Sequence, residues 1–210
     1  MADLMVSPAH SLRGTLTLPG DKSISHRCFL LGAVAQGPTR ITRFLESEDV
    51  GRSRRAVELL GIPIRQDGQA LILEGRGWDG LREPRTPLDM GNSGTTTRLL
   101  LGILAGCPFP ASLIGDASLS ARPMRRVTEP LVRMGAAIEG PHGPDRLPLT
   151  IRGGRIQGIR YEMPVASAQV KSALLLAGLR ADAPTTVVEP LLTRYHTERM
   201  LRWMGARVES

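Results

Sequence analysis

The hydrophobic positions of the chain repeat with a period of about 70 residues. In each of three blocks, small polar residues precede an apolar stretch with helical spacing. These stretches are HRCFLLGAVAQG after Ser23, TTTRLLLGILAG after Asn92-Ser93-Gly94, and AQVKSALLLAGL after Ser167. Since small polar side chains supply the hydrogen bonds that a helix start lacks, we expect each block to open with a capped helix.

A second helix in each block is predicted to end at a glycine, Gly61, Gly135 or Gly205, followed by a short strand. Trp203 and Met204 fit the apolar pattern of the third of these helices and are expected in its core face. Arg122, immediately before Pro123, is expected at the start of the second of these helices. The three helix-to-strand segments are AVELLGIPI (56–64), PLVRMGAAIE (130–139) and MLRWMGARVE (200–209). Between the two helices of each block, β-branched stretches predict strands at TRITRF (39–44), PASLIG (110–115) and PTTVVE (184–189).

The predicted unit is therefore helix, strand, helix, strand. In the first two blocks a further strand follows, at ALILEG (70–75) and LPLTIRG (147–153). The third block lacks this ending, because the sequence stops at Ser210. We therefore expect the sequence to be a piece of a longer protein.

If three such units pack around a pseudo-threefold axis with their first helices inside, the three capped N-termini meet at one end. Each N-terminus carries unpaired N–H groups and about half a positive charge, which favours a phosphate or carboxylate ligand. A cation recurs four residues after each cap, as Arg27, Arg98 and Lys171, on the same helical face. Arg98 and Lys171 are equally well explained as solvated or packing residues, because this spacing arises easily by chance.

The positive net charge of the chain indicates which classes of ligand it is suited to bind. The 210 residues include 27 Lys+Arg against 20 Asp+Glu, a formal net charge of +7. Nucleic-acid binding is one interpretation of such a balance, but aromatic residues make up only 3%, too few for a platform on which bases stack. The other interpretation is a site for small, highly anionic substrates, since a positive field speeds their capture. We therefore expect no nucleic-acid partner.

Nothing in the sequence indicates a membrane partner, an export signal or a metal centre. The longest apolar runs, LLLGILAG and ALLLAGL, are far shorter than the roughly 20 residues of a membrane span. The N-terminal MADLMVSPAHSLRG lacks the pattern of a secretory signal, so the expected location is the cytoplasm. The histidines His10, His142 and His196 show no metal-ligand spacing.

The segment LPGDKSISHR places Lys22 and Arg27 between a strand and the first turn of a helix. It is not a P-loop, because Asp21 separates Gly20 from Lys22 and the glycine spacing that cradles nucleotide phosphates is missing. A nucleotide kinase is therefore disfavoured.

Four motifs together carry a resemblance to a known family. They are LPGDKSISHR (18–27), GNSGTTTR (91–98), SARPM (120–124) and SAQVKSALLLAGL (167–179). In this order and spacing they resemble the N-terminal half of the 5-enolpyruvylshikimate-3-phosphate synthase family. The resemblance implies an α/β fold, one domain of an inside-out α/β barrel called the enolpyruvyl transferase fold, with three βαβαββ-type repeats of which the third is truncated.

The resemblance also implies domain boundaries. Residues 1–18 would belong to the other domain of the family, and residues 19–210 would form a three-repeat substrate-binding domain. The repeats would span about 19–85, 86–158 and 159–210. The C-terminal domain of the family is absent, and we expect this complementary half to be needed. A strand at RGTLTL (13–18) would otherwise have no sheet to join.

Members of the family transfer the enolpyruvyl group of phosphoenolpyruvate to the 5-hydroxyl of shikimate 3-phosphate and release phosphate, on the way to chorismate, without a metal or an organic cofactor. By motif position, the resemblance implies a catalytic role for Lys22, which would contact both substrates. The residues implied for shikimate 3-phosphate are Lys22, Ser23, Arg27, Ser167, Ala168, Gln169 and Arg194. Those implied for phosphoenolpyruvate are Lys22, Asn92, Gly94, Arg122 and Gln169.

The chain departs from the common pattern of the family at two positions, where Ala168 and Thr193 stand in place of serine. Ala168 offers only its backbone N–H, whereas Thr193 keeps a hydroxyl. The herbicide glyphosate occupies the phosphoenolpyruvate site in this family, and bulk at the position of Gly94 gives tolerance, so the retained glycine predicts sensitivity. Two alternatives remain open: a relative of the enolpyruvyl transferase that uses UDP-N-acetylglucosamine, and a basic binding module without catalytic activity.

Overall fold

The three predicted repeats each form a unit of alternating helices and strands in the computed structural model, which describes residues 4–209. Residues 1–3 of the predicted N-terminal segment and Ser210 of the third repeat lie outside the described residues. The first unit comprises α1 (Lys22–Val34), β1 (Gln36–Ile41), α2 (Glu48–Leu59), β2 (Ile64–Asp67), β3 (Ala70–Arg76) and the 3-10 helix η1 (Trp78–Gly80). Its strands form an antiparallel sheet in the order β1-β3-β2.

The second unit is the most complete of the three. It comprises β4 (Leu88–Asp89), α3 (Gly94–Ala105), β5 (Pro110–Ile114), α4 (Ala117–Ser120), α5 (Arg125–Arg133), β6 (Ala137–Glu139) and β7 (Leu149–Arg152). The sheet order is β4-β5-β7-β6, and β4 runs parallel to β5.

The third unit comprises β8 (Arg160–Glu162), α6 (Ala168–Gly178), β9 (Thr186–Val188) and α7 (His196–Trp203). β8 and β9 pair in parallel, as β4 and β5 do in the second unit.

The predicted helix boundaries are confirmed except at one start. Gly61, Gly135 and Gly205 adopt positive φ angles of 88°, 111° and 90° immediately beyond the second helices, a conformation that favours glycine. Ser93 and Ser167 cap α3 and α6 by accepting hydrogen bonds from Thr96 N and Val170 N. The prediction that Ser23 caps the first helix is wrong. Asp21 caps α1, because its Oδ1 accepts a hydrogen bond of 2.8 Å from Ile24 N.

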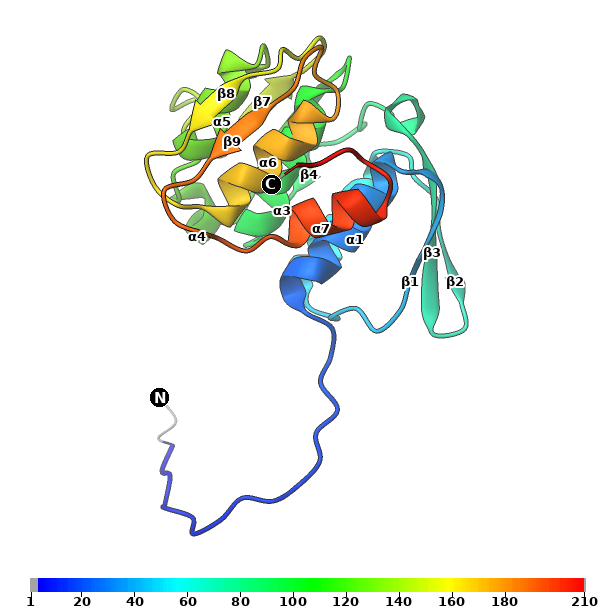
Figure 1. Cartoon of the computed structure of the whole chain (residues 1–210), viewed down its shortest axis with the longest axis vertical. Coiled ribbons are helices and arrows are strands. Elements are labelled where there is room, and N and C mark those ends of the chain that lie inside the picture. Colours follow the sequence, from blue (N-terminus) through cyan, green and yellow to red (C-terminus); the bar gives the residue numbers. More distant parts are fainter. Residues whose placement is uncertain (1–3, 210) are drawn as a thin grey trace.

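Two predicted strands do not form. Residues 13–18 are exposed coil, with Leu16 and Leu18 85% and 78% exposed, in an arm that leads away from the body (Figure 1). Residues 206–209 also lack strand structure. A strand needs a neighbour to satisfy its backbone groups, and neither segment has one among the described residues.

Two further expectations about the second helices need correction. Trp203 is 85% exposed and not in the core, because α7 buries the face that carries Thr197, Glu198 and Leu201. Arg122 was expected at the start of the second helix, but it lies in the turn between α4 and α5. The short helix α4 is not among the predicted elements.

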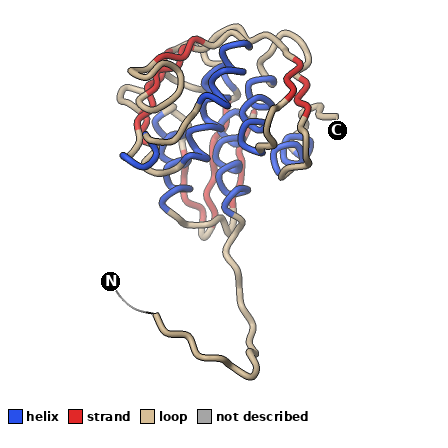
Figure 2. Tube along the Cα trace, turned by 90° about the vertical axis from the view of Figure 1, so that its left-hand side faces the viewer, coloured by secondary structure: helices blue, strands red, loops and turns tan. Residues whose placement is uncertain are grey.

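α3 packs on both α1 and α6, and the strands lie at the sides of the group of helices (Figure 2). α3 is the central element, and ten of its 12 residues are buried. It packs closely on α6 because Gly102 has no side chain. A Cβ built there would lie 2.2 Å from the carbonyl oxygen of Ala173. Within residues 4–209, none of the helices is long and apolar enough to cross a bilayer.

This close approach predicts opposite effects for two glycine substitutions. Gly102→Ala should destabilise the fold by about 2 kcal/mol, because the new methyl group meets backbone atoms that cannot move aside. Gly51→Ala, in exposed α2 with no atom within 4 Å of the new Cβ, should instead stabilise it by about 0.5–1 kcal/mol through helix propensity. Urea unfolding followed by circular dichroism measures both. Equal effects of the two substitutions would contradict the proposed packing.

Candidate functional site

The N-terminal turns of α1, α3 and α6 are joined to one another by side-chain hydrogen bonds. Gln169 in α6 donates to Thr95 Oγ1 in α3 at 3.0 Å, and Arg27 in α1 donates to Ser172 Oγ in α6 at 2.7 Å. His26 in α1 and Thr96 in α3 share a hydroxyl network described below. The predicted convergence of the three helix starts is thus present, and it concentrates the positive ends of three helix dipoles.

Arg27 is held in place before any ligand arrives. It is only 4% exposed, and its Nε donates to Thr197 Oγ1 at 2.6 Å while Nη1 donates to Ser23 O at 2.9 Å. Burial and the nearby Arg194 lower the pKa of Arg27 to about 10, so the guanidinium stays charged at neutral pH. Counting partners among the described residues, two of its five N–H groups remain for an anion.

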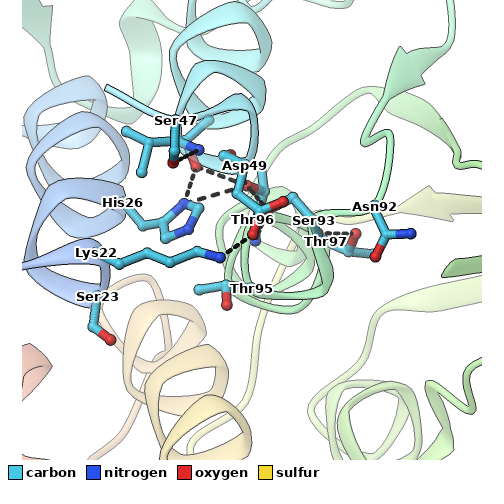
Figure 3. A network of polar contacts seen from close by, with 12 residues as sticks. Lys22, Ser23, His26, Ser47, Asp49, Asn92, Ser93, Thr95, Thr96 and Thr97 are labelled. Carbon is cyan, nitrogen blue, oxygen red and sulfur yellow. Dashed lines mark hydrogen bonds and ion pairs between the residues drawn. The ribbon is translucent and has the colours of Figure 1, made fainter. Parts of the chain in front are cut away.

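Lys22 extends from α1 toward the first turn of α3, where Figure 3 shows it near Thr95. Its Nζ forms an ion pair with Asp49 Oδ2, and the lysine side chain is half exposed. Asp49 lies in the first turn of α2, which Ser47 caps. This carboxylate compensates part of the positive potential of the site and orients the ammonium group.

A chain of buried hydroxyls connects α1, α2 and α3 behind Lys22 (Figure 3). His26 Nδ1 lies 2.8 Å from Ser53 Oγ, which lies 2.8 Å from Thr96 Oγ1. Thr96 Oγ1 is in turn 2.7 Å from Ser93 Oγ and donates to Asp49 O at 3.3 Å. The network therefore fixes the backbone of the residue that pairs with Lys22.

The hydrogen-bond partners assign the proton of His26. Nε2 is buried without a partner among residues 4–209, and a buried N–H without a partner is rarer than a buried acceptor without one. We therefore assign the proton to Nδ1, which donates to Ser53 Oγ. A second proton on Nε2 would have no acceptor and would be desolvated, and burial lowers the pKa of His26 to about 4.

Asn92, Gly94 and Arg122 form one group at the start of α3. Arg122 Nη2 donates to Asn92 Oδ1 and, at 3.2 Å, to Ser118 Oγ, while Asn92 Nδ2 donates to Asp116 Oδ2 at 2.8 Å. A Cβ on Gly94 would lie 3.6 Å from Arg122 Nη1. The missing side chain of Gly94 thus lets the guanidinium of Arg122 approach the start of α3.

Arg98 also lies beside Gly94. A Cβ on Gly94 would lie 2.7 Å from Arg98 Nη1, and Arg98 donates to Gln169 Oε1 and to Pro123 O, each at 3.1 Å. Burial lowers the pKa of Arg98, and the charges of Arg122 and Arg126 lower it further. Of the two interpretations of Arg98, that of an ordinary solvated residue is wrong. It holds the Gln169 side chain that was predicted to reach both substrates.

The remaining predicted residues, Ser167, Ala168 and Arg194, lie on the third unit. Ser167 caps α6 and Ala168 is its first residue, so their backbone N–H groups belong to the helix start. Arg194 lies between β9 and α7, and its Nη1 donates to Ser23 Oγ at 3.0 Å. The structure therefore brings all ten predicted residues into one region.

Sequence reasoning missed several polar residues of this region. They are Ser53, Asp49, Thr95, Thr96, Ser172 and Thr197. The threonines of GNSGTTTR were an available signal, because three consecutive β-branched polar residues disfavour an ordinary helix start. No pattern marked Ser53 or Thr197, since a single hydroxyl in a helix is common.

Known proteins share the sequence and the fold of this chain. A family model described as EPSP synthase (3-phosphoshikimate 1-carboxyvinyltransferase) matches residues 6–210. The curated 3-phosphoshikimate 1-carboxyvinyltransferase of Geobacillus kaustophilus is 58% identical over 198 residues, which is 94% of this chain and 46% of that protein. The corresponding protein of Bacillus cytotoxicus is 54% identical, with 94% of this chain and 47% of that protein covered.

A solved structure is also similar. EPSP synthase from Acinetobacter baumannii matches with a TM-score of 0.88 and 48% identity, covering 94% of this chain and 45% of that one. The predicted fold class, one domain of the enolpyruvyl transferase fold, is thereby confirmed. The chain spans about half the length of the curated relatives that it matches.

The environment of His26 predicts a pH dependence of stability. Because its pKa is about 6.5 in the unfolded chain and about 4 in the fold, the unfolded chain binds the proton first. His26 therefore contributes stability above pH 6.5 that is lost as the pH falls to about 4, amounting to about 3 kcal/mol. His26→Asn should remove this pH-dependent contribution.

The measurement is urea unfolding of both proteins at pH 7.5 and pH 4. The difference between the two proteins in the pH dependence of the free energy of unfolding reports on His26, because both proteins contain the carboxylates that titrate in the same range. His142→Asn, at an exposed histidine, is the matched control and should behave like the unmodified chain. An identical pH dependence for His26→Asn and the unmodified chain would overturn the assignment of a buried, neutral imidazole.

Proposed function

The chain belongs to the EPSP synthase family, and from that premise we propose that it forms one half of an enolpyruvyl transferase. The whole protein transfers the enolpyruvyl group of phosphoenolpyruvate to the 5-hydroxyl of shikimate 3-phosphate and releases phosphate, a step toward chorismate and the aromatic amino acids. This chain supplies the side of the site that binds shikimate 3-phosphate, and part of the phosphoenolpyruvate site. The complementary half supplies the rest.

One observation carries the proposal: three helix N-termini and several cations converge on one exposed region. Five cationic side chains lie there, Lys22, Arg27, Arg98, Arg122 and Arg194. Both proposed substrates carry a carboxylate and a phosphate, so each needs cations and N–H donors at two places. A site of this composition suits two small polyanions better than a nucleotide or a neutral sugar.

Shikimate 3-phosphate is proposed to bind between α1 and α6. Arg27 is preorganised with two free N–H groups, and Ser23 and Arg194 already contact each other across this space. An anion that inserts there accepts hydrogen bonds from both. Ser167, the backbone N–H of Ala168 and the amide of Gln169 complete the subsite from the start of α6.

Phosphoenolpyruvate is proposed to bind at the start of α3. Arg122, oriented by Asn92 and Ser118, lies beside Gly94. Lys22 and Gln169 lie between the two subsites and contact both substrates. Glyphosate, a small phosphonate with a carboxylate, fits the same donors, and we propose it as an inhibitor that binds at this subsite beside Gly94.

The reaction requires a proton to reach the methylene carbon of phosphoenolpyruvate and another to leave the 5-hydroxyl. Lys22 is the proposed catalytic residue of this half, because its ammonium group can stabilise developing negative charge and donate a proton. Asp49 keeps that group oriented. The further acid and base groups come from the complementary half, which the exposed arm of residues 4–18 would join.

The comparisons favour this function over its rivals. The curated relatives are 3-phosphoshikimate 1-carboxyvinyltransferases at 58% and 54% identity, which disfavours a transferase for UDP-N-acetylglucosamine and a non-catalytic basic module. We place the protein in the cytoplasm, which suits the unpaired thiols of Cys28 and Cys107. No metal or organic cofactor enters the proposed reaction.

The proposal predicts that this chain binds shikimate 3-phosphate in preference to shikimate. Arg27→Ala and Lys22→Ala should each weaken binding of shikimate 3-phosphate by roughly 10- to 100-fold, since each removes a charge-assisted hydrogen bond. Isothermal titration calorimetry or NMR titration measures the affinities. Arg65→Ala, which removes an exposed ion pair with Glu74 far from the site, is the control and should have no effect.

Two outcomes would contradict the proposal. Equal affinity for shikimate and shikimate 3-phosphate would leave no role for the phosphate subsite. Preference for UDP-N-acetylglucosamine, or for DNA or RNA with a steep salt dependence, would support one of the rival functions.

A second prediction concerns turnover. The chain alone should release little or no phosphate from the two substrates, because it lacks the acid and base groups that the complementary half is proposed to supply. Addition of the separately expressed C-terminal half of a curated relative should restore activity and raise the melting temperature of the chain. Substantial activity of the chain alone, or an unchanged melting temperature in the mixture, would argue against division of the site between two halves.

A further inference from the structure

Lys171 has a position that neither of its two sequence interpretations describes. It is one of two lysines in the chain, and its side chain is only 6% exposed in the first turn of α6. Its Nζ donates to Glu189 Oε1 at 2.9 Å and lies 2.7 Å from Glu198 Oε1. Lys171 is thus neither a solvated cation nor a simple packing residue, but the centre of a buried ion cluster.

The two carboxylates come from opposite ends of one connecting segment. Glu189 follows directly after β9, and Glu198 lies in the first turn of α7. Figure 1 shows the segment between them running from β9 to the start of α7, and α7 packs on α1. Lys171 therefore ties together both ends of the segment that carries Arg194.

Contacts on either side of Arg194 transmit this restraint. Thr193 is bound to Glu189 twice, through its hydroxyl at 2.6 Å and its backbone N–H at 3.3 Å. On the other side, Thr197 lies next to Glu198 and is bound by Arg27 and Ser172 at 2.6 and 2.7 Å. The backbone flanking Arg194 is fixed on both sides, while the Arg194 side chain itself is exposed.

The charges of the cluster indicate that it holds the connecting segment in place. Burial raises the pKa of Glu189, but the hydrogen bonds from Thr193 and Lys171 outweigh it, and the net shift is downward, so the carboxylate is ionised. A buried ion cluster adds little stability over well-packed apolar residues of similar volume. It does restrict the segment to one arrangement, because a carboxylate displaced from Lys171 would be buried without a partner.

We propose that Lys171 is a positioning residue for the phosphate of shikimate 3-phosphate. Through Glu189 and Glu198 it clamps the segment 189–198 so that Arg194 faces Ser23 and Arg27. The inference rests on the proposed function, since it assigns to Arg194 the recognition of a phosphate group. Lys171 itself does not touch the substrate.

The test measures phosphate discrimination, defined as the affinity for shikimate 3-phosphate divided by that for shikimate. Arg194→Ala should lower this ratio by about tenfold or more, the effect of losing one charge-assisted hydrogen bond. Lys171→Met and Glu189→Gln should each lower it by about fivefold or more while leaving the affinity for shikimate unchanged. Arg65→Met, at a distant exposed ion pair, is the control and should leave the ratio unchanged.

Double variants separate positioning from general loss of structure. If Lys171 acts through Arg194, Lys171→Met should lower the ratio no further when Arg194→Ala is already present. Melting temperatures are measured in parallel. If Lys171→Met does not fold, Glu189→Gln decides, because it keeps the pair of Lys171 with Glu198 and leaves no carboxylate without a partner.

The inference is overturned if the affinity ratio stays within twofold of the unmodified value in Glu189→Gln and in every folded variant of Lys171. It is also overturned if the effects of Lys171→Met and Arg194→Ala on the ratio are fully additive. Failure of the proposed function gives a different result, because the unmodified chain would then fail to discriminate shikimate 3-phosphate from shikimate. The inference is supported if the affinity ratio falls in Lys171→Met and Glu189→Gln and if Lys171→Met lowers it no further in the presence of Arg194→Ala.

Discussion

The site depends on how the fold tolerates positive potential at one place. Three helix N-termini repel one another when they converge, and Arg27 adds a full charge that is almost completely buried. The fold offsets this mainly with oxygen atoms of neutral groups, since Ser172, Thr197 and the backbone carbonyl of Ser23 accept from Arg27. Because neutral acceptors leave the charge intact, the region remains attractive to anions.

The hydroxyl chain from His26 to Asp49 holds Lys22 in place without adding charge beside it. Neutral His26 adds no charge beside the ammonium group, and Thr96 fixes the backbone of the carboxylate that orients it. Arg122 and Gln169 are likewise restrained by neighbours before a ligand binds. Such preorganisation reduces the entropy lost on binding. These restraints suit the proposed role of this chain in recognition, and the proposed chemistry depends on the complementary half.

Much of the fold was predictable from the sequence because the repeats mark it three times. The apolar helices, the strands that follow them and the glycines at positive φ recur at equivalent places. The strands at 13–18 and 206–209 were not predictable in the same way, because strand formation depends on a neighbour and not only on the residues themselves. Trp203 was misplaced since apolar spacing alone does not say which face a short helix buries.

The site was predictable only as far as the motifs reached. The ten residues carried over from the family do converge, but Asp49, Ser53 and Thr197 have no local signature. Their roles arise from contacts between units that are far apart in the sequence. The same holds for Arg98 and Lys171, whose spacing was uninformative until the structure showed their partners.

The cations Arg27, Arg98 and Lys171, which lie near the starts of the first helices of the three units, have different partners in the fold. Three identical units around an axis would present three equivalent binding faces, and such a site could not hold two different molecules in a fixed mutual order. In this chain Arg27 is bound to the hydroxyl of Ser172, Arg98 holds a neighbouring amide, and Lys171 pairs with two carboxylates. The similarity of the three units is thus broken near each helix start, and this asymmetry would give the proposed site a direction along which two unlike substrates can be arranged.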